Sequence, residues 1–161
     1  GMRVADLGAA PGSWTQYAVE RGARVVAVDL LAMAPVAGAE IVTGDFLDPA
    51  VQAMVLARLG GPADLVLSDI APNTTGPRAV DRLRAEAVAE AVVAFAARAL
   101  RPDGRCLLKL LKGSEATLVP AVRDLFSGYR LLKPKATRAD SSEIYLLATG
   151  RRAPAGDDGP G

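Results

Sequence analysis

The sequence predicts an α/β fold: a mostly parallel sheet of seven strands with helices on both faces. Short apolar runs recur along the chain, and continuous runs of this kind are typical of strands buried on both faces. Segments with helical spacing lie between the runs, and this alternation implies right-handed crossovers between parallel strands. The 161 residues are the size of one domain, and 50% of them are hydrophobic, which is enough to fill a core.

The apolar runs give seven expected strands, at residues 3–5, 24–28, 40–43, 64–67, 105–110, 129–132 and 143–147. A turn at residues 101–104 precedes the fifth strand. Four helices are expected at residues 14–21, 51–59, 82–100 and 117–126, and the third has an apolar stripe of Leu83, Val88, Val92 and Phe95. We expect one domain over residues 1–152. Residues 153–161 are rich in Gly, Pro and Asp, so a disordered tail is expected there.

The most informative turn follows the first strand, where residues 6–14 read Asp-Leu-Gly-Ala-Ala-Pro-Gly-Ser-Trp. In an open α/β sheet, a nucleotide-like cofactor meets the protein at such a turn. Gly8 and Gly12 leave room for the backbone to approach a ligand. The dinucleotide fingerprint is Gly-x-Gly-x-x-Gly, whereas three residues including Pro11 separate the two glycines here. This spacing suits S-adenosylmethionine better than NAD; the alternative is a plain strand-to-helix turn.

Three aspartates, Asp29, Asp45 and Asp69, follow successive expected strands. Ligands of open α/β sheets bind outside the carboxyl ends of the strands. An acid after the second strand can accept hydrogen bonds from both hydroxyls of an adenosine ribose, and an acid after the third can accept one from the adenine amino group. Each aspartate alone could be an ordinary turn residue. Three at successive strand ends favour a cofactor site.

Lys109 interrupts the apolar run of the fifth strand, where a buried strand would hold an aliphatic residue. Partial burial of an ammonium group favours the neutral amine, which can act as a general base. Glu143 begins the last strand and is a candidate charge partner; a nearby carboxylate would favour the charged form again. The alternative is a lysine at an edge or strand end that reaches solvent.

The net charge of +1 hides an asymmetry between the halves of the chain. Residues 1–100 hold eight Lys and Arg against eleven Asp and Glu, whereas residues 101–161 hold eleven against seven. A basic second half suits an anionic partner, and nucleic acid is the obvious candidate. The alternative is an ordinary solvated surface.

Two residue types limit the chemistry. The chain has no histidine, which excludes His-based general-base catalysis and the common zinc sites, so no metal site is expected. The single cysteine, Cys106, lies in an apolar run, which favours a core position and a reducing compartment. The sequence shows neither a signal peptide nor an apolar stretch long enough to span a membrane, so we expect a soluble, cytoplasmic protein without a membrane partner.

Further motifs run in order along the chain: Asp29-Leu-Leu-Ala-Met33, Gly44-Asp-Phe46, Ser68-Asp-Ile-Ala-Pro-Asn73 followed by Gly76 and Asp81, Leu108-Lys-Leu110 with Gly113, and Lys133-Pro134 through Arg138 to Ser142-Glu-Ile-Tyr145. Together with residues 6–14, they resemble the FtsJ-like family of RNA ribose 2′-O-methyltransferases. Enzymes that methylate amino groups share instead an Asn/Asp-Pro-Pro-aromatic motif, which this chain lacks.

The resemblance implies a Rossmann-like S-adenosylmethionine-dependent methyltransferase fold with a C-terminal antiparallel strand. It implies cofactor contacts from the glycine turn with Trp14, and from the strand-end aspartates: Gly8, Gly12, Asp29, Asp45 and Asp69. Lys109 would be the catalytic base, with Asp69 and Glu143 in its charge network. Lys112, Lys133, Lys135 and Arg138 are candidates for RNA phosphate contacts. The implied substrate is a uridine of 23S ribosomal RNA in the large subunit, and the protein is expected to be a monomer.

Family members carry a further catalytic lysine on an N-terminal helix before the cofactor turn. This sequence begins at Gly1-Met2-Arg3, so the resemblance implies that the helix is absent from it. The catalytic set would then reduce to Asp69, Lys109 and Glu143. A second hypothesis is therefore a catalytically incomplete module that binds cofactor or RNA. A third is a small-molecule methyltransferase, against which the basic second half argues.

Overall fold

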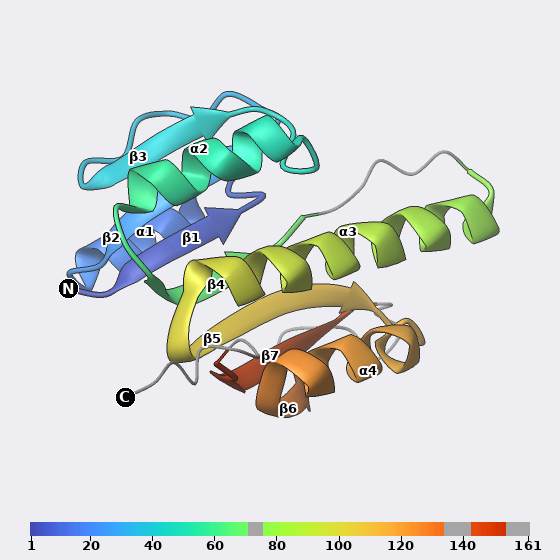
Figure 1. Cartoon of the computed structure of the whole chain (residues 1–161). Helices are drawn as coiled ribbons and strands as arrows, with labels where there is room; N and C mark the ends of the chain where they lie inside the picture. Colours follow the sequence, from blue (N-terminus) through green and yellow to red (C-terminus); the bar gives the residue numbers. More distant parts are fainter. Residues whose placement is uncertain (71–75, 134–142, 154–161) are drawn as a thin grey trace.

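A seven-stranded β-sheet forms the centre of the structure, a computed structural model that describes residues 1–70, 76–133 and 143–153 (Figure 1). The strands are β1 (Arg3–Leu7), β2 (Arg24–Asp29), β3 (Ala39–Thr43), β4 (Ala63–Ser68), β5 (Leu100–Leu111), β6 (Phe126–Leu132) and β7 (Glu143–Arg151). Their order in the sheet is β3-β2-β1-β4-β5-β7-β6. β1 to β5 are parallel, whereas β7 is antiparallel to both β5 and β6. The predicted fold class is confirmed.

The helices in the described part of the chain are α1 (Ser13–Glu20), α2 (Pro49–Leu59), α3 (Arg78–Ala99) and α4 (Glu115–Leu125). In Figure 1, α2, α3 and α4 lie on the near face of the sheet, and α1 lies behind β1 and β2. The near-face core includes the fully buried Phe95 and Phe126, together with Cys106 as expected. Trp14 and Val19 of α1 pack on the other face. Helices therefore cover both faces, as predicted.

Every expected strand and helix is present, with ends that differ by a few residues. The largest difference is in β5, which begins at Leu100 rather than after the predicted turn. Ala63 pairs with Leu100 and Leu65 pairs with Arg105, so residues 101–104 bulge out of the strand. Asp103 in this bulge has a positive φ of 65°. The predicted turn is therefore an interruption inside β5 and not the segment before it.

Some expectations fall outside the described residues, namely the tail from 154 to 161 and the candidate phosphate contacts Lys135 and Arg138. The described helices include none that is long and apolar enough to cross a membrane.

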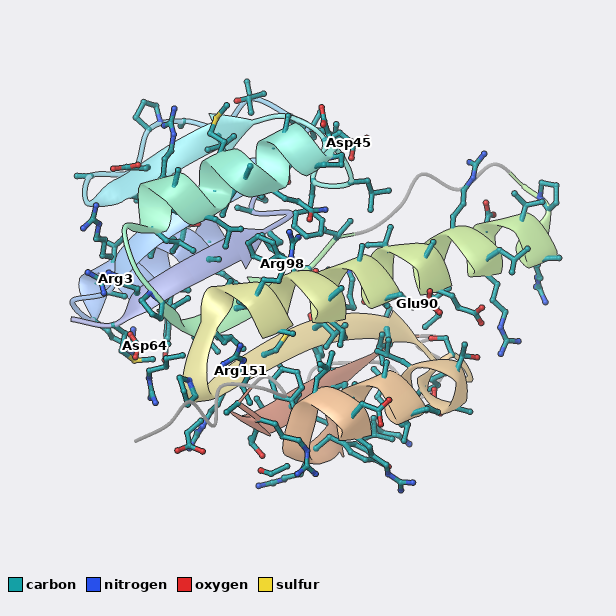
Figure 2. All side chains as sticks on the ribbon, in the orientation of Figure 1. Arg3, Asp45, Asp64, Glu90, Arg98 and Arg151 are labelled. Atoms are coloured by element: carbon teal, nitrogen blue, oxygen red, sulfur yellow. The ribbon has the colours of Figure 1, made fainter. Side chains whose placement is uncertain are left out.

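The fold directs attention to the edge where the parallel strands end. The strand order reverses between β1 and β4, and ligands of open α/β sheets bind at the carboxyl ends beside such a point. Figure 2 shows Asp45 at this edge and Arg3 and Asp64 at the opposite one. At that opposite edge, Asp64 accepts a hydrogen bond of 2.8 Å from the Arg3 amide and one of 2.6 Å from Nε of Arg101.

Candidate active site

The turn after β1 is held by hydrogen bonds to the end of β2. The amides of Gly8 and Ala9 both donate to one carbonyl of β2, at 2.8 and 3.1 Å. The Oδ2 atom of Asp29 accepts from the Ala10 amide at 2.9 Å. Gly8 has a φ of 74°, and a Cβ there would lie 2.8 Å from the side chain of Ile70. The backbone of the turn is thus fixed between β2 and the residues that follow β4.

Two adjoining hollows open around this turn. The larger, of about 510 Å³, is lined by Asp29 and Asp45, and the smaller, of about 170 Å³, is lined by Trp14. Gly8 and Asp69 line both. The larger hollow alone is within the usual range of small-molecule sites. The structure therefore brings five of the six predicted cofactor residues, all but Gly12, to one cleft with two compartments.

Gly12 has a different place from Gly8. It is buried at the N-terminus of α1, where its φ of 118° turns the chain into the helix. A Cβ at this position would lie 3.2 Å from the side chain of Met33, so there is little room for one. Its carbonyl accepts the first hydrogen bond of α1, from the amide of Gln16 at 2.9 Å. The glycine here shapes the turn beneath the cleft.

Asp29 and Asp45 face the larger hollow with acceptor capacity to spare. The Oδ1 atom of Asp29 accepts from the Leu31 amide, and Oδ1 of Asp45 accepts from the Leu47 amide, each at 2.9 Å. A carboxylate offers about four acceptor positions, so each aspartate can take further hydrogen bonds from hydroxyl or amino groups. Two carboxylates with open acceptor positions suit an adenosine, whose ribose hydroxyls and adenine amino group are hydrogen-bond donors.

The loop that carries Asp45 is anchored by its neighbours. Phe46 is buried and meets the ring of Phe95 in α3 edge-on, with ring centroids 5.3 Å apart. On the other side of Asp45, a Cβ at Gly44 would lie 2.9 Å from the side chain of Val51. Close packing on both sides holds the exposed Asp45 carboxylate at the rim of the cleft.

Lys109 is at the centre of a charge network beside the cleft. Its Nζ atom lies 3.1 Å from Oδ1 of Asp69 and 3.7 Å from Oε1 of Glu143. The lysine side chain is only 15% exposed, whereas the two carboxylates are 38% and 45% exposed. Lys109 is in β5, Glu143 begins β7, and Asp69 directly follows β4. Pairing of these strands therefore brings together the three residues predicted for catalysis.

Tyr145 joins the same network, although its sequence position alone did not mark it as a site residue. It pairs with Lys109 across β5 and β7, and its hydroxyl donates to Oδ1 of Asp69 at 3.3 Å. Burial, together with the nearby Asp69 carboxylate, raises the pKa of Tyr145 to about 12, so the hydroxyl remains a donor. Its ring lies 5.9 Å from that of Trp14. The sequence signal that could have marked Tyr145 as a site residue was its position two residues after Glu143, which puts both side chains on the same face of a strand.

Asp6 is a second site residue that the sequence did not reveal. Its side chain is 1% exposed in β1, lines the smaller hollow, and accepts a hydrogen bond from the Thr15 hydroxyl at 2.6 Å. Burial raises the pKa of Asp6 to about 6; the Thr15 hydrogen bond opposes this rise, and the carboxylates of Asp69 and Asp29 add to it. An acidic residue inside an apolar strand, like Lys109 in its own strand, was the signal that could have found it.

The candidate RNA contacts lie at the same edge of the sheet where the structure describes them. Lys112 follows β5 and Lys133 follows β6, and both are exposed. β6 runs in the same direction as β5, because β7 is antiparallel to both. Arg84 of α3, which the sequence motifs did not single out, lines the larger hollow. Basic side chains from both halves of the chain therefore lie along the edge of the sheet that carries the cleft.

Together the fold and the cleft define a class: an α/β enzyme domain that binds a nucleoside-type cofactor at a glycine turn, with a lysine–carboxylate network alongside. Comparison with known proteins identifies the family. The model of the FtsJ-like methyltransferase family matches residues 1–151, and the chain belongs to this family. It is a methyltransferase domain with S-adenosylmethionine as its cofactor, which confirms the predicted family, enzyme class and cofactor.

Two relatives and one solved structure illustrate the similarity. The chain is 50% identical to a ribosomal RNA large subunit methyltransferase E from Gluconobacter oxydans, over 94% of this chain and 58% of the relative. It is 49% identical to the protein of the same name from Acidiphilium cryptum, over 94% of this chain and 68% of the relative. A ribosomal RNA methyltransferase structure from Plasmodium falciparum superposes with a TM-score of 0.81 at 22% identity, over 94% of this chain and 87% of that one, which shows a shared fold.

Proposed function

We propose that this domain transfers a methyl group from S-adenosylmethionine to a ribose 2′-hydroxyl of RNA, with a uridine of large-subunit (23S) ribosomal RNA as the acceptor. The observation that carries the proposal is Lys109, held between Asp69 and Glu143 beside the cofactor cleft. The names of the two relatives support ribosomal RNA as the substrate. The chain spans 58% and 68% of their lengths, so the activity of the whole protein is part of the proposal.

In this proposal, the larger hollow takes the adenosine. Asp29 accepts from the ribose hydroxyls and Asp45 from the adenine amino group, using the acceptor positions that their backbone hydrogen bonds leave open. The smaller hollow, lined by Gly8 and Trp14 above the turn that Gly12 shapes, takes the methionyl end. When bound, S-adenosylmethionine supplies an electrophilic methyl group on a sulfonium sulfur.

Lys109 acts on the RNA hydroxyl. Its Nζ atom accepts or steers the hydroxyl proton, while Asp69 and Glu143 fix the position of the Lys109 side chain. Asp69 borders both hollows and contacts Lys109, so one carboxylate ties the base to the cofactor cleft. Because a neutral thioether would leave without needing a proton, alignment of the hydroxyl by Lys109 would supply much of the acceleration.

The RNA is proposed to lie along the basic edge of the sheet. Lys112 and Lys133 are exposed there, and Lys135 and Arg138, outside the described residues, complete the set of predicted phosphate contacts. Phosphate contacts make affinity depend on salt, because each one releases counterions. We propose that the protein works in the cytoplasm as a monomer.

The test measures methyl transfer from radiolabelled S-adenosylmethionine to large ribosomal subunits prepared without this modification. Resistance of the labelled site to alkaline hydrolysis identifies a ribose 2′-O-methyl group. The 161-residue chain and a longer form of the protein are assayed in parallel. No ribose labelling by either form would refute the proposal, and labelling by the longer form alone would assign the non-catalytic alternative to the shorter chain.

Lys109→Met separates catalysis from binding. We expect at least about a hundredfold loss of turnover, the usual contribution of general acid–base catalysis, with affinity for S-adenosylhomocysteine within about twofold of the parent. Lys112→Met is the matched control: it removes an exposed lysine three positions along the chain and should change RNA affinity more than turnover. Equal loss of turnover in both variants would exclude Lys109 as the base.

A further inference from the structure

A glutamine of α2, to which the proposed function gives no role, holds the loop that carries Asp45. Gln52 is half-buried near the start of α2, and its Nε2 atom donates to the Phe46 carbonyl at 2.9 Å. Its Oε1 atom accepts from Nη2 of Arg98 in α3. An arginine only donates and a carbonyl only accepts, so these two partners fix which way the Gln52 amide faces. Gln52 therefore connects α3 to the loop with one hydrogen bond on each side.

The carbonyl that Gln52 binds belongs to the same peptide unit as an amide that binds Asp45. The Phe46 carbonyl and the Leu47 N–H are the two polar groups of one planar peptide bond, so neither can turn without the other. The Leu47 amide donates to Oδ1 of Asp45 at 2.9 Å. The hydrogen bond from Gln52 at one end of the peptide therefore bears on the orientation of the Asp45 carboxylate at the other end.

The hydrogen bonds of this series, here called the Arg98–Asp45 relay, all point the same way. Arg98 donates to Gln52, and Gln52 donates to the Phe46 carbonyl. The amide on the other side of that peptide donates to Asp45. The relay thus runs from a guanidinium cation through two amide groups to a carboxylate anion. Hydrogen bonds to charged groups are the stronger kind, and bonds aligned in series polarise one another.

α3 supports the relay with a second side chain. Phe95 lies three positions before Arg98, a spacing that puts both on one side of a helix. The Phe95 ring meets that of Phe46 with centroids 5.3 Å apart, and the Arg98 guanidinium lies 6.0 Å from the centre of the Phe95 ring. Figure 2 shows Arg98 between α2 and α3. The ring contact places Phe46, and the hydrogen bond from Gln52 orients its carbonyl.

We propose that Gln52 is a positioning residue for adenine recognition: through the Arg98–Asp45 relay, it holds the Asp45 carboxylate in the orientation that accepts from the adenine amino group. This inference rests on the proposed function, which puts adenine against Asp45 in the larger hollow. Gln52 is not among the described residues that line this hollow, so it acts through Asp45. Loss of the relay therefore weakens ligands that carry the amino group and spares a ligand that lacks it.

The experiment compares two ligands by calorimetric titration. S-adenosylhomocysteine has the adenine amino group, whereas its 6-deamino analogue has a hydrogen atom in that place. The parent should prefer S-adenosylhomocysteine about tenfold to a hundredfold, the range for a hydrogen bond to a charged group. Asp45→Ala removes the proposed acceptor and should reduce this preference to about threefold or less.

Gln52→Glu tests the relay itself. It keeps the length of the side chain and the bond from Arg98, but it puts an acceptor where the Phe46 carbonyl needs a donor. The preference should fall at least about fivefold, with the 6-deamino analogue bound within about twofold of the parent. Arg98→Met leaves Gln52 its donor and should lower the preference about threefold. Arg58→Met removes an exposed arginine from the last turn of α2 and, as the matched control, should keep the parental preference.

The outcomes separate the inference from the proposed function. Parental preference in Gln52→Glu, or equal weakening of both ligands, would overturn the inference and leave Gln52 as a link between two helices. If Gln52→Glu does not fold, Arg98→Met decides, and an unchanged preference there overturns the inference. Parental preference in Asp45→Ala would overturn the proposed contact between Asp45 and adenine, and the inference with it. Failure of the parent to bind S-adenosylhomocysteine, in both the short and longer forms, would overturn the proposed function itself.

Discussion

Replacing Asp6 with asparagine should change how the stability of the ligand-free protein depends on pH. The pKa of the Asp6 carboxyl is raised from 3.8 to about 6 by burial. Between these two values, the folded protein holds a proton at Asp6 that the unfolded chain has released, so the free energy of unfolding falls as pH rises. One pKa unit corresponds to about 1.4 kcal/mol, which makes the whole contribution about 3 kcal/mol. It is present in full below pH 3.8 and lost above pH 6.

Urea unfolding, followed by fluorescence of Trp14, the single tryptophan, measures this contribution. The stability of the parent minus that of Asp6→Asn should be about 2–3 kcal/mol larger at pH 4 than at pH 7. Because the comparison is between two pH values, any effect of the substitution on stability that does not depend on pH, such as the fit of the Asn amide, cancels.

Asp64→Asn is the matched control. Its carboxyl has a lowered pKa, caused first by the hydrogen bond from the Arg3 amide, so its contribution is present at neutral pH and lost on acidification. If the difference in stability between the parent and Asp6→Asn were the same at pH 4 and pH 7, the conclusion that burial raises the pKa of Asp6 would be refuted.

Three further substitutions test the core, the turn and the charge network. Phe95→Ala removes a fully buried ring and should destabilise the fold by about 3–5 kcal/mol in urea unfolding. Gly8→Ala puts a Cβ 2.8 Å from Ile70 at a φ of 74°, so it should displace the turn and reduce S-adenosylhomocysteine affinity at least about tenfold in calorimetry. Tyr145→Phe removes the hydrogen bond to Asp69 and should lower the rate of RNA methylation about threefold to tenfold, with ligand affinity nearly unchanged.

Each expectation has an outcome that would contradict it. A Phe95→Ala protein within about 1 kcal/mol of the parent would mean that the core refills the space. Unchanged ligand affinity in Gly8→Ala would show that the turn relaxes away from Ile70 without consequence. A Tyr145→Phe enzyme with parental turnover would leave the hydroxyl outside the catalytic arrangement, whereas a loss of ligand affinity would place its role in the cleft.

Local sequence patterns predicted the fold because most strands contain a short apolar run with a clear end. The same ends carry Asp29, Asp45 and Asp69, so the composition of the cleft was also readable. Lys109 and Glu143 could be paired in advance only as a hypothesis. Their contact depends on β7 lying beside β5, which is now visible as a direct strand pairing.

What the sequence did not reveal depends on contacts between distant elements. Tyr145 became a site residue only through its register opposite Lys109, and a one-residue slip in that pairing would turn it to the other face of the sheet. Within the described residues, Oδ1 of Asp6 has no hydrogen-bond partner, and no local sequence pattern encodes which distant groups fail to reach a side chain. The bulge at residues 101–104 depends on strand pairing: Leu100 already pairs with β4, so the turn-forming residues that follow it lie inside β5.

The position of β7 has a consequence for biosynthesis. β7 leaves the ribosome after the other six strands of this sheet, yet it lies between β5 and β6, which do not pair with each other. A growing chain can assemble the glycine turn and the three strand-end aspartates well before Glu143 and Tyr145 exist. Until β7 emerges, the inner edges of β5 and β6 are open to pairing with other chains. The strand that completes the charge network is thus also the one that closes the sheet, so a chain that stops short of it is expected to aggregate through the open strand edges and to lack the proposed catalytic network.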